Sequence, residues 1–464
     1  MTPRTRIGIS ICTAMLATLG CSGSDGDTQP TKVVTIGGVI DQTGSAGPPS
    51  WSSAAQLAVA QMNIALANAK SDIQFNLVLA DSTNQPAVAA QRAQELVRLH
   101  GAKGLVVDTS QDDIAVLKLQ YDPDPTVHLD VPVVGLVATS PSINNPATTN
   151  PDPVTQAAYN DAEHWNFRTA MSSVAQGLAL ANIVIGKLGK PSFKISAFAS
   201  DEPFGNGQVA ALKAALASLA PSAVVETIKF SPAEHTVNDL DFFLAQMLKI
   251  LDQHNEETGL DDGLPDVWMG LTFPDYLVAM VKAYRLSGST LPGVHGMGLR
   301  NQKVLDSLGN DGNGQEGTCY VVVDATPSGA TFTTDMVAAT GLPPSSMDSS
   351  TYDATVVLML AALAAANGQP DATAITGAQI RAMVRGTSDP MGQIVRTGVD
   401  EFVKAVGLIG QGVPINYEGA QSPCDFDESG SVATRFTHFV IANGAFVDLE
   451  VYDCVASPTC PVQL

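Results

Sequence analysis

Positively charged residues are scarce in this chain of 464 residues. Lys and Arg together number 24 against 46 Asp and Glu, and the formal net charge at pH 7 is -22. An electrostatic field of this sign repels phosphate backbones and anionic membrane surfaces. The charge therefore argues against nucleic acid as a partner. Apolar residues make up 45% of the chain, so we expect a large buried core.

Long hydrophobic runs are also lacking. No segment after residue 20 approaches 18 uninterrupted apolar residues, so we predict no membrane-spanning helix there. Arg4 and Arg6 precede a short uncharged stretch at 7–20, which is typical of a signal peptide covering residues 1–20. Cys21 follows, and then a polar tether to residue 32.

The end of this stretch resembles a bacterial lipobox, although Thr18 stands where such boxes usually carry Leu. The resemblance implies that Cys21 is lipidated and that the protein is a lipoprotein anchored in the periplasm or cell envelope. An ordinary cleaved signal peptide with an incidental cysteine is the alternative.

Catalytic, redox and metal motifs are absent from the sequence. It contains no Gly-x-Ser-x-Gly, no His-Glu-x-x-His, no Walker phosphate loop and no Cys-x-x-Cys. Gly205 and Gly207 fit part of a dinucleotide fingerprint, but they do not directly follow the expected strand at 193–198. We therefore predict that the protein is not an enzyme and needs no cofactor and no metal.

Six cysteines are present, and two of them, Cys12 and Cys21, belong to the signal peptide and its end. In an oxidising compartment the other four could form two disulfides in three possible connectivities. These four are Cys319, Cys424, Cys454 and Cys460. The pair closest in sequence, Cys454 and Cys460, is the disulfide that we expect.

Short apolar runs alternate with helical patterns from residue 33 onward. The apolar runs at 104–107 and 131–137 are typical of parallel strands covered by helices on both faces. A second set begins after residue 169, and Asn443-Gly444 predicts a hairpin turn near the end of the chain. We predict an α/β fold of two Rossmann-like lobes. Ligands bind outside the carboxyl ends of such strands, which places a site at loops 108–113, 137–141, 200–204 and 271–275.

Seven segments carry a resemblance to a known family. They are Val34-Thr35-Ile36-Gly37-Gly38-Val39 with Ala55 to Asn63, Ala80-Asp81-Ser82, Val131 to Val134 with Ala138-Thr139-Ser140-Pro141, Phe167-Arg168-Thr169, Phe204-Gly205-Asn206-Gly207, Tyr417 to Pro423, and Asp425 to Gly430. In this order they resemble the type I periplasmic solute-binding proteins of the leucine/isoleucine/valine-binding group. The resemblance covers roughly 33–452.

The resemblance implies two lobes that are joined by three crossovers and close around a small solute like a hinge. The crossovers fall near 171/172, 327/328 and 437/438. The N-lobe is then expected to comprise 33–171 plus 328–437, and the C-lobe 172–327 plus 438–464.

The resemblance also implies a function. We expect a monomeric extracytoplasmic protein that captures an amino acid, amide or related solute for an ABC permease in the inner membrane. Two alternatives stay open. One is a ligand-sensing or scavenging lipoprotein of the same fold without a transporter, and the other is a hydrolase on a similar scaffold.

The resemblance assigns the polar part of the site to the N-lobe. In relatives that bind α-amino acids, hydroxyls and backbone N–H groups of this lobe hold the ligand carboxylate. Thr139 matches a position that supplies a hydroxyl, and Val137 one that supplies a backbone carbonyl. The second hydroxyl position falls on Gln111, or on Ser110 if the register shifts by one residue.

In the C-lobe, the aromatic wall of the family falls on Phe204 and on Thr272 or Phe273. The acidic residue that pairs with the ligand ammonium falls on Met297. A thioether cannot balance a buried ammonium, and an uncompensated buried charge costs several kcal/mol.

Either another acid, such as Asp201 or Asp275, replaces the missing partner, or the ligand is not a simple α-amino acid. We expect the second case, with a less polar solute that bears a carboxylate or an amide.

Overall fold

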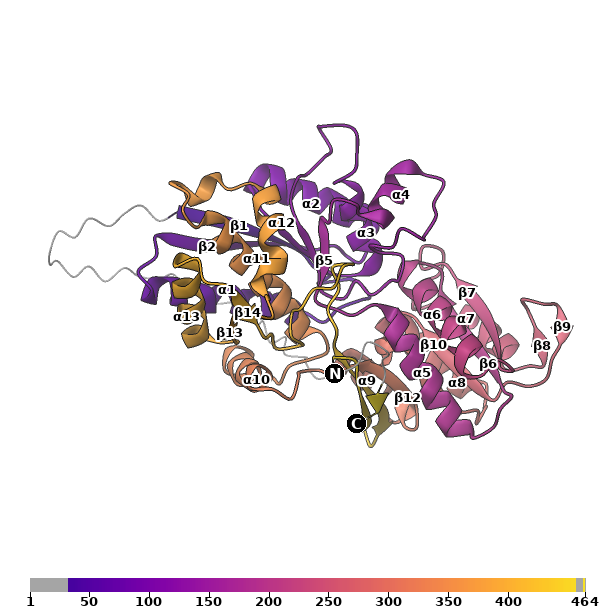
Figure 1. The fold of residues 1–464 in the computed structure, drawn as a ribbon. Helices are drawn as coiled ribbons and strands as arrows, with labels where there is room; N and C mark the ends of the chain where they lie inside the picture. The colour runs from indigo at the N-terminus through magenta and orange to yellow at the C-terminus, as the bar shows by residue number, and fades with distance from the viewer. Residues whose placement is uncertain (1–31, 456–461, 464) are drawn as a thin grey trace, which may run out of the picture.

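The first lobe is built on a parallel sheet of five strands in the order β2-β1-β3-β4-β5. This computed structural model describes residues 32–455 and 462–463 (Figure 1). The strands are Lys32–Val39 (β1), Ile73–Ala80 (β2), Leu105–Val107 (β3), Val133–Gly135 (β4) and Asn166–Arg168 (β5). All residues of β3 and β4 are buried, as expected for parallel strands covered on both faces.

Helices from two distant parts of the chain cover this sheet. The early helices are Ser50–Asn68 (α1), Pro86–His100 (α2), Ser110–Lys118 (α3) and Pro153–Asn160 (α4). The late elements are Pro327–Thr340 (α10), Asp348–Ala366 (α11), Ala372–Ala374 (η3), Gly377–Val384 (α12), Arg385–Thr387 (η4), Gln393–Val395 (β13), Val399–Gly410 (α13) and Ile415–Tyr417 (β14). Because α1 packs against α11 and α13, the late segment completes the first lobe.

Helix α11 is the central helix of this lobe. By length and composition alone it could cross a membrane, but 94% of its most apolar window is buried inside the protein. It contacts α1 and the strands β1, β3 and β4. Its apolar composition therefore reflects a position in the core.

The second lobe contains two sheets that continue each other. The first has the order β10-β6-β7, and the second has the order β11-β12-β15-β16-β17. The strands are Lys194–Ser200 (β6), Val224–Phe230 (β7), Val267–Leu271 (β10), Val294–His295 (β11), Glu316–Tyr320 (β12), Arg435–Ala442 (β15), Ala445–Asp453 (β16) and Val462–Gln463 (β17). A parallel bridge between Trp268 and Gly293 joins the two sheets.

The helices of the second lobe lie on these sheets in pairs. Helix α5 packs against α6, and α7 packs against α8 (Figure 1). The elements are Ser173–Leu188 (α5), Pro203–Leu219 (α6), Leu240–Ile250 (α7), Pro274–Leu286 (α8), Met297–Leu299 (η1), Gln302–Leu308 (α9) and Gly309–Gly312 (η2), with a short hairpin of His254–Asn255 (β8) and Leu260–Asp261 (β9). The predicted α/β class with two Rossmann-like lobes is confirmed.

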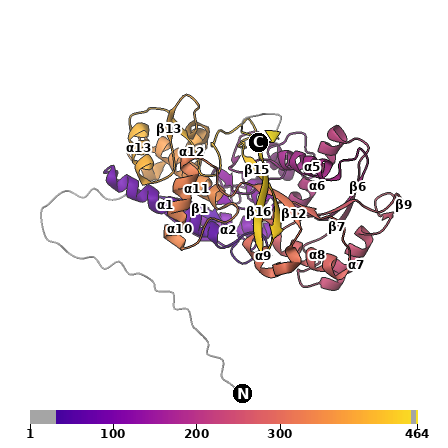
Figure 2. The same ribbon diagram turned by 90° about the horizontal axis from the view of Figure 1, so that it is seen from below.

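The C-terminal hairpin belongs to the second lobe. Strand β15 pairs antiparallel with β12, from Glu316 opposite Val440 to Tyr320 opposite Phe436. The predicted crossover at 437/438 therefore falls inside β15. Figure 2 shows β12, β15 and β16 between the helices α10 and α11 on one side and α5 to α8 on the other. The other crossovers stay predictions.

Hydrogen bonds tie the connecting segments together. The Ser173 N–H donates to the Thr139 carbonyl at 2.7 Å, and the Ser349 hydroxyl donates to the Val322 carbonyl at 2.7 Å. The Tyr320 hydroxyl donates to the Met171 carbonyl. The chain is thus held firmly where it passes from one lobe to the other.

The cysteines do not form two disulfides among the described residues. Cys319 and Cys424 are buried free thiols, and burial raises the pKa of both. Cys454 is disulfide-bonded. Its expected partner Cys460 lies outside the described residues, as does Cys21, so both assignments stay predictions.

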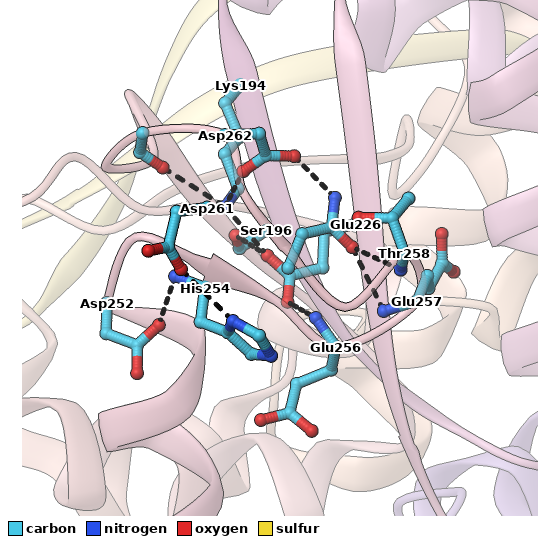
Figure 3. Close-up of polar contacts among 12 residues, drawn as sticks. Lys194, Ser196, Glu226, Asp252, His254, Glu256, Glu257, Thr258, Asp261 and Asp262 are labelled. Carbon is cyan, nitrogen blue, oxygen red and sulfur yellow. Dashed lines mark hydrogen bonds and ion pairs between the residues drawn. The ribbon is translucent and has the colours of Figure 1, made fainter.

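An internal ion cluster anchors the β8–β9 hairpin to the second lobe (Figure 3). The Lys194 ammonium lies 2.5 Å from the Asp262 carboxylate and 3.2 Å from the Glu226 carboxylate. Glu226 is fully buried and also accepts hydrogen bonds from the Ser196 hydroxyl and the Glu256 N–H. The hairpin is therefore fixed through one buried lysine.

Candidate functional site

A cavity lies between the two lobes. Its volume is about 480 Å³, which includes open solvent. The first lobe lines it with Ala46, Trp51, Thr109, Ser110, Val137 and Met347. The second lobe lines it with Phe204, Phe273, Pro274, Met297, Arg300 and Asn301.

The topology explains why these residues meet. Thr109 and Ser110 follow β3, Val137 follows β4, Phe204 follows β6, and Phe273 follows β10. The carboxyl ends of the parallel strands in both lobes therefore face the cavity, as expected for doubly wound sheets. Each of the four loops that we expected to form a site contributes a lining residue.

Aromatic and thioether side chains give the cavity its apolar character. The rings of Phe204 and Phe273 are stacked, with centroids 5.1 Å apart and an interplanar angle of 22°. Trp51 lines the cavity from the other lobe, and Met297 and Met347 complete the apolar surface. Stacked rings and soft sulfur atoms suit an apolar or planar guest.

A strained turn positions Met347. Its backbone has φ of 69°, in the left-handed region that residues other than glycine seldom adopt. The Trp51 Nε1–H donates to the Ser346 carbonyl at 2.9 Å. The Asp348 carboxylate accepts from the Ser345 N–H at 2.6 Å and from the Ser50 hydroxyl at 2.8 Å, and burial raises its pKa to about 7. These contacts hold the turn against Trp51.

The loop before α1 supports the other side of Trp51. The Asp41 carboxylate accepts hydrogen bonds from the N–H groups of Gly44 at 2.6 Å and Ala46 at 2.8 Å. A Cβ atom at Gly47 would lie 2.3 Å from the Trp51 ring carbon Cε3. Only glycine therefore allows the loop to approach the indole this closely.

Buried carboxyl groups lie behind Thr109 and Ser110. The Asp108 carboxylate accepts from the N–H groups of Thr109 at 2.7 Å and Asp41 at 2.5 Å. Burial and the charge of Asp41 raise the pKa of Asp108 to about 6. Burial and the charge of Asp108 raise the pKa of Asp112 well above its usual range. These groups brace the loop without lining the cavity.

Five of the eight predicted ligand residues line the cavity: Ser110, Val137, Phe204, Phe273 and Met297. The structure brings these five together from both lobes. Of the two alternatives at 110 and 111, Ser110 lines the cavity and Gln111 does not.

Gln111, Thr139 and Thr272 do not line the cavity. The Gln111 amide donates to the Asn84 backbone carbonyl at 2.7 Å and to Asn84 Oδ1 at 2.9 Å. Thr139 is fully buried, and its hydroxyl accepts from the Ser173 hydroxyl at 3.0 Å. Thr272 is buried behind Phe273 with 1% exposure. Each of these side chains is directed into the protein by local packing.

No acidic side chain lines the cavity among the residues that the structure describes. Asp275 forms an ion pair with Lys303 at 2.6 Å, and Asp201 lies 3.7 Å from Lys229 on the surface. Neither acid therefore replaces the ammonium partner that is missing at Met297. The described residues also contain no cluster of three His, Cys, Asp or Glu that could hold a metal ion.

Arg300 and the Ser346–Met347 turn were not predicted from the sequence. Arg300 follows the short helix η1 directly, so only the placement of that helix brings it to the cavity. The turn reaches Trp51 through the hydrogen bond from the Trp51 Nε1–H to the Ser346 carbonyl, which spans 295 positions of the chain. The prolines at 343 and 344 mark a turn in the sequence, but nothing there shows that this turn reaches the cavity.

Comparison with known proteins adds the family. A protein-family model described as "Periplasmic binding protein" matches residues 33–405. A comparison with curated proteins finds no match.

Several solved structures have the same fold. A leucine-binding protein from Thermotoga maritima is 16% identical, with a TM-score of 0.63 over 90% of this chain and 98% of that chain. A branched-chain amino acid substrate-binding protein from Streptococcus pneumoniae in complex with isoleucine is 17% identical, with a TM-score of 0.61 over 90% and 100%. A solute-binding protein of an ABC transporter from R. palustris in complex with benzoate is 15% identical, with a TM-score of 0.64 over 90% and 96%. These similarities confirm the predicted type I periplasmic binding protein fold.

Proposed function

Because this chain belongs to the periplasmic binding protein family, we propose that it captures a small solute between its lobes for import by an ABC transporter. The observation that carries the proposal is the cavity lined by the carboxyl ends of strands from both lobes. A solute held there contacts both lobes only when they are close together. Binding therefore shifts the equilibrium toward the closed arrangement, by as much as the solute prefers it.

The proposed ligand contacts are Ser110, Val137, Phe204, Phe273 and Met297, with Trp51 and Met347 as further apolar surface. The ligand is an apolar or aromatic solute that bears a carboxylate or an amide. The absence of an acid among the described lining residues disfavours an ammonium group, and the stacked rings favour a planar body. One structural neighbour holds benzoate, and another holds 3,4-dihydroxybenzoic acid.

The proposal includes the place of action. The family is one of periplasmic binding proteins, so the protein works outside the cytoplasm. A lipid on Cys21 would tether it to a membrane, with the tether to residue 32 as a spacer. In this arrangement a monomer delivers the solute to a permease, and no catalytic step is needed.

A thermal-shift screen tests the proposed function. Any solute bound only by the folded state raises the unfolding free energy, by about 2.7 kcal/mol at 100 times its Kd. The panel should contain branched-chain amino acids, aromatic carboxylates and their amides. We expect at least one of them to raise the Tm, and the Phe204→Ala variant to lose most of the shift. If no panel member stabilises the protein and no small molecule copurifies with it in mass spectrometry, the proposal is wrong.

A further inference from the structure

Arg300 carries the one charge among the described residues that line the cavity. It also lines a larger outer groove between the loop after α10 and the β15–β16 turn, whose volume of about 1820 Å³ includes open solvent. Arg300 therefore lies where an apolar inner cavity meets an open outer groove.

The surroundings of Arg300 leave part of its hydrogen-bonding capacity unused. Its side chain is 11% exposed and forms an ion pair with Asp448 through both Nη atoms. The guanidinium carbon lies 5.1 Å from the centre of the Phe439 ring and 5.7 Å from that of Phe446. The Nε–H is buried and has no hydrogen-bond partner among the described residues. A buried donor without a partner costs free energy until an acceptor arrives.

The counter-ion of Arg300, Asp448, is half-exposed to solvent. The Asp448 side chain is 53% exposed, so water can solvate its carboxylate when the arginine turns away. Asp448 pairs with Phe439 at the point where the register between β15 and β16 shifts. Because one partner is half-exposed, water can take the place of the arginine at that carboxylate. The pair with Asp448 engages both Nη atoms and leaves the Nε–H without an acceptor among the described residues.

The charge of the cavity selects the ligand. A cavity whose one charged lining residue is an arginine, with stacked aromatic rings and no acid in the described lining, favours a planar anion and disfavours an ammonium. The planar fork of arginine matches the two oxygens of a carboxylate.

We propose that Arg300 is the specificity-determining residue of the cleft, which exchanges Asp448 for the carboxylate of an apolar or aromatic monocarboxylate that lacks an ammonium group. This inference rests on the proposed function. The ligand body then lies against Phe204 and Phe273, and its carboxylate lies at the boundary with the outer groove. The proposed function allows either an acid or an amide as the ligand. Arg300 favours the acid, because a carboxylate carries the negative charge that an amide lacks.

Isothermal titration calorimetry on the full chain with two matched pairs of probes tests this assignment. Benzoate and benzamide differ only in charge at one end, and 3-phenylpropanoate and L-phenylalanine differ in the ammonium group. We expect wild type to prefer each plain carboxylate by about 10- to 100-fold, the range for a hydrogen bond to a charged group.

The variants separate the role of Arg300 from a general loss of structure. Arg300→Met should abolish the preference for benzoate over benzamide, and Arg300→Lys should restore part of it. Asp448→Asn should tighten benzoate by about two- to fivefold, because an exposed competitor is removed. Arg285→Met is the matched control, since Arg285 also lies over an aromatic ring, Tyr284, but does not line the cavity. It should leave the affinities unchanged.

Several results would overturn the assignment while the proposed function stands. These are equal binding of benzoate and benzamide by wild type, tighter binding of L-phenylalanine than of 3-phenylpropanoate, or an unchanged carboxylate preference in Arg300→Met. A screen in which the best ligand is an uncharged amide or a zwitterionic amino acid overturns it in the same way. Failure of every solute in the thermal-shift panel, together with no small molecule that copurifies, would instead reject the proposed function itself.

Discussion

Ser110 and Thr139 are hydroxyl residues of the first lobe with different surroundings. The Ser110 hydroxyl oxygen accepts from the Ser140 N–H at 3.0 Å and borders the cavity, so its own proton is free to reach a ligand. Thr139 is bound to Ser173 by both its hydroxyl and its backbone carbonyl. The first hydroxyl is therefore placed for binding, and the second for joining α5 to the first lobe.

A pair of alanine substitutions separates these roles. Ser110→Ala should weaken ligand binding by about three- to tenfold, the range for one neutral hydrogen bond. Thr139→Ala should lower the free energy of unfolding by about 1 kcal/mol, because the Ser173 hydroxyl loses its acceptor. Calorimetric titration and urea denaturation measure the two effects. A larger loss of affinity in Thr139→Ala than in Ser110→Ala would contradict this division.

Residue types alone could not reveal these surroundings. Val137, Phe204 and Phe273 lie in loops that the ends of the apolar runs predict, and Met297 follows from the family resemblance; all four line the cavity. Whether a hydroxyl near such an end faces the cavity depends on side-chain partners from distant segments. The Thr139 hydroxyl is hydrogen-bonded to Ser173, 34 positions away, and the local sequence pattern does not indicate this contact.

At the scale of elements, the β8–β9 hairpin depends on one ion cluster. The Lys194 ammonium is shared between the fully buried Glu226 carboxylate and Asp262, and the Asn255 amide donates to Asp262 at 2.6 Å (Figure 3). The Glu226 carboxylate in turn accepts from the Glu256 N–H in the hairpin at 2.9 Å. The ion pairs of Lys194 and the hydrogen bond to Glu226 thus connect the hairpin to β6 and β7.

Removal of the Lys194 ammonium should therefore destabilise the folded protein. Lys194→Met leaves the Glu226 carboxylate buried without its partner, and we expect the free energy of unfolding to fall by about 3 to 5 kcal/mol. The double variant Lys194→Met/Glu226→Gln should recover part of this loss, since the uncompensated charge is gone. Urea denaturation measures both. If the double variant is less stable than Lys194→Met, the buried charge is not the cause.

The elements were predicted unevenly. The apolar runs that became β3 and β4 are readable because both faces of these strands are buried. The Asn443-Gly444 turn is readable because both residues adopt positive φ, at 54° and 72°. The hairpin of β8 and β9 and the strained turn before α11 carry no such signal, because tertiary contacts stabilise them.

At the scale of the whole molecule, several carboxyl groups are buried in the core. Burial raises the pKa of four of them to about 7 and that of Asp108 to about 6, from ordinary values of 3.8 for Asp and 4.5 for Glu. The four are Asp113, Glu202, Asp348 and Asp353. Between pH 4 and pH 7 the folded state therefore binds more protons than the unfolded state. The buried His295, whose pKa burial lowers to about 4, acts in the opposite direction but is one group against five. We therefore expect stability to fall as the pH rises through this range.

We expect the Tm to be higher at pH 5 than at pH 8 by at least about 3 °C, roughly the effect of 1 kcal/mol in a domain of moderate size. Scanning calorimetry across this range measures it. The Asp112→Asn variant should gain stability at pH 8 and little at pH 5, because the amide removes the cost of ionising a buried carboxyl beside Asp108. A Tm that rises steadily from pH 5 to pH 8 would contradict the prediction.

The pairing of β12 with β15 has a consequence for biosynthesis. The sheet of the second lobe cannot form completely until the chain has been synthesised almost to its end, because Glu316 pairs with Val440. The first lobe is also completed late, because α11 and α13 follow the segment that forms most of the second lobe. A nascent chain that stops before residue 435 exposes the bare edge of β12, a template for aggregation. Quality control during secretion should therefore act most strongly on chains shortened by a few dozen residues.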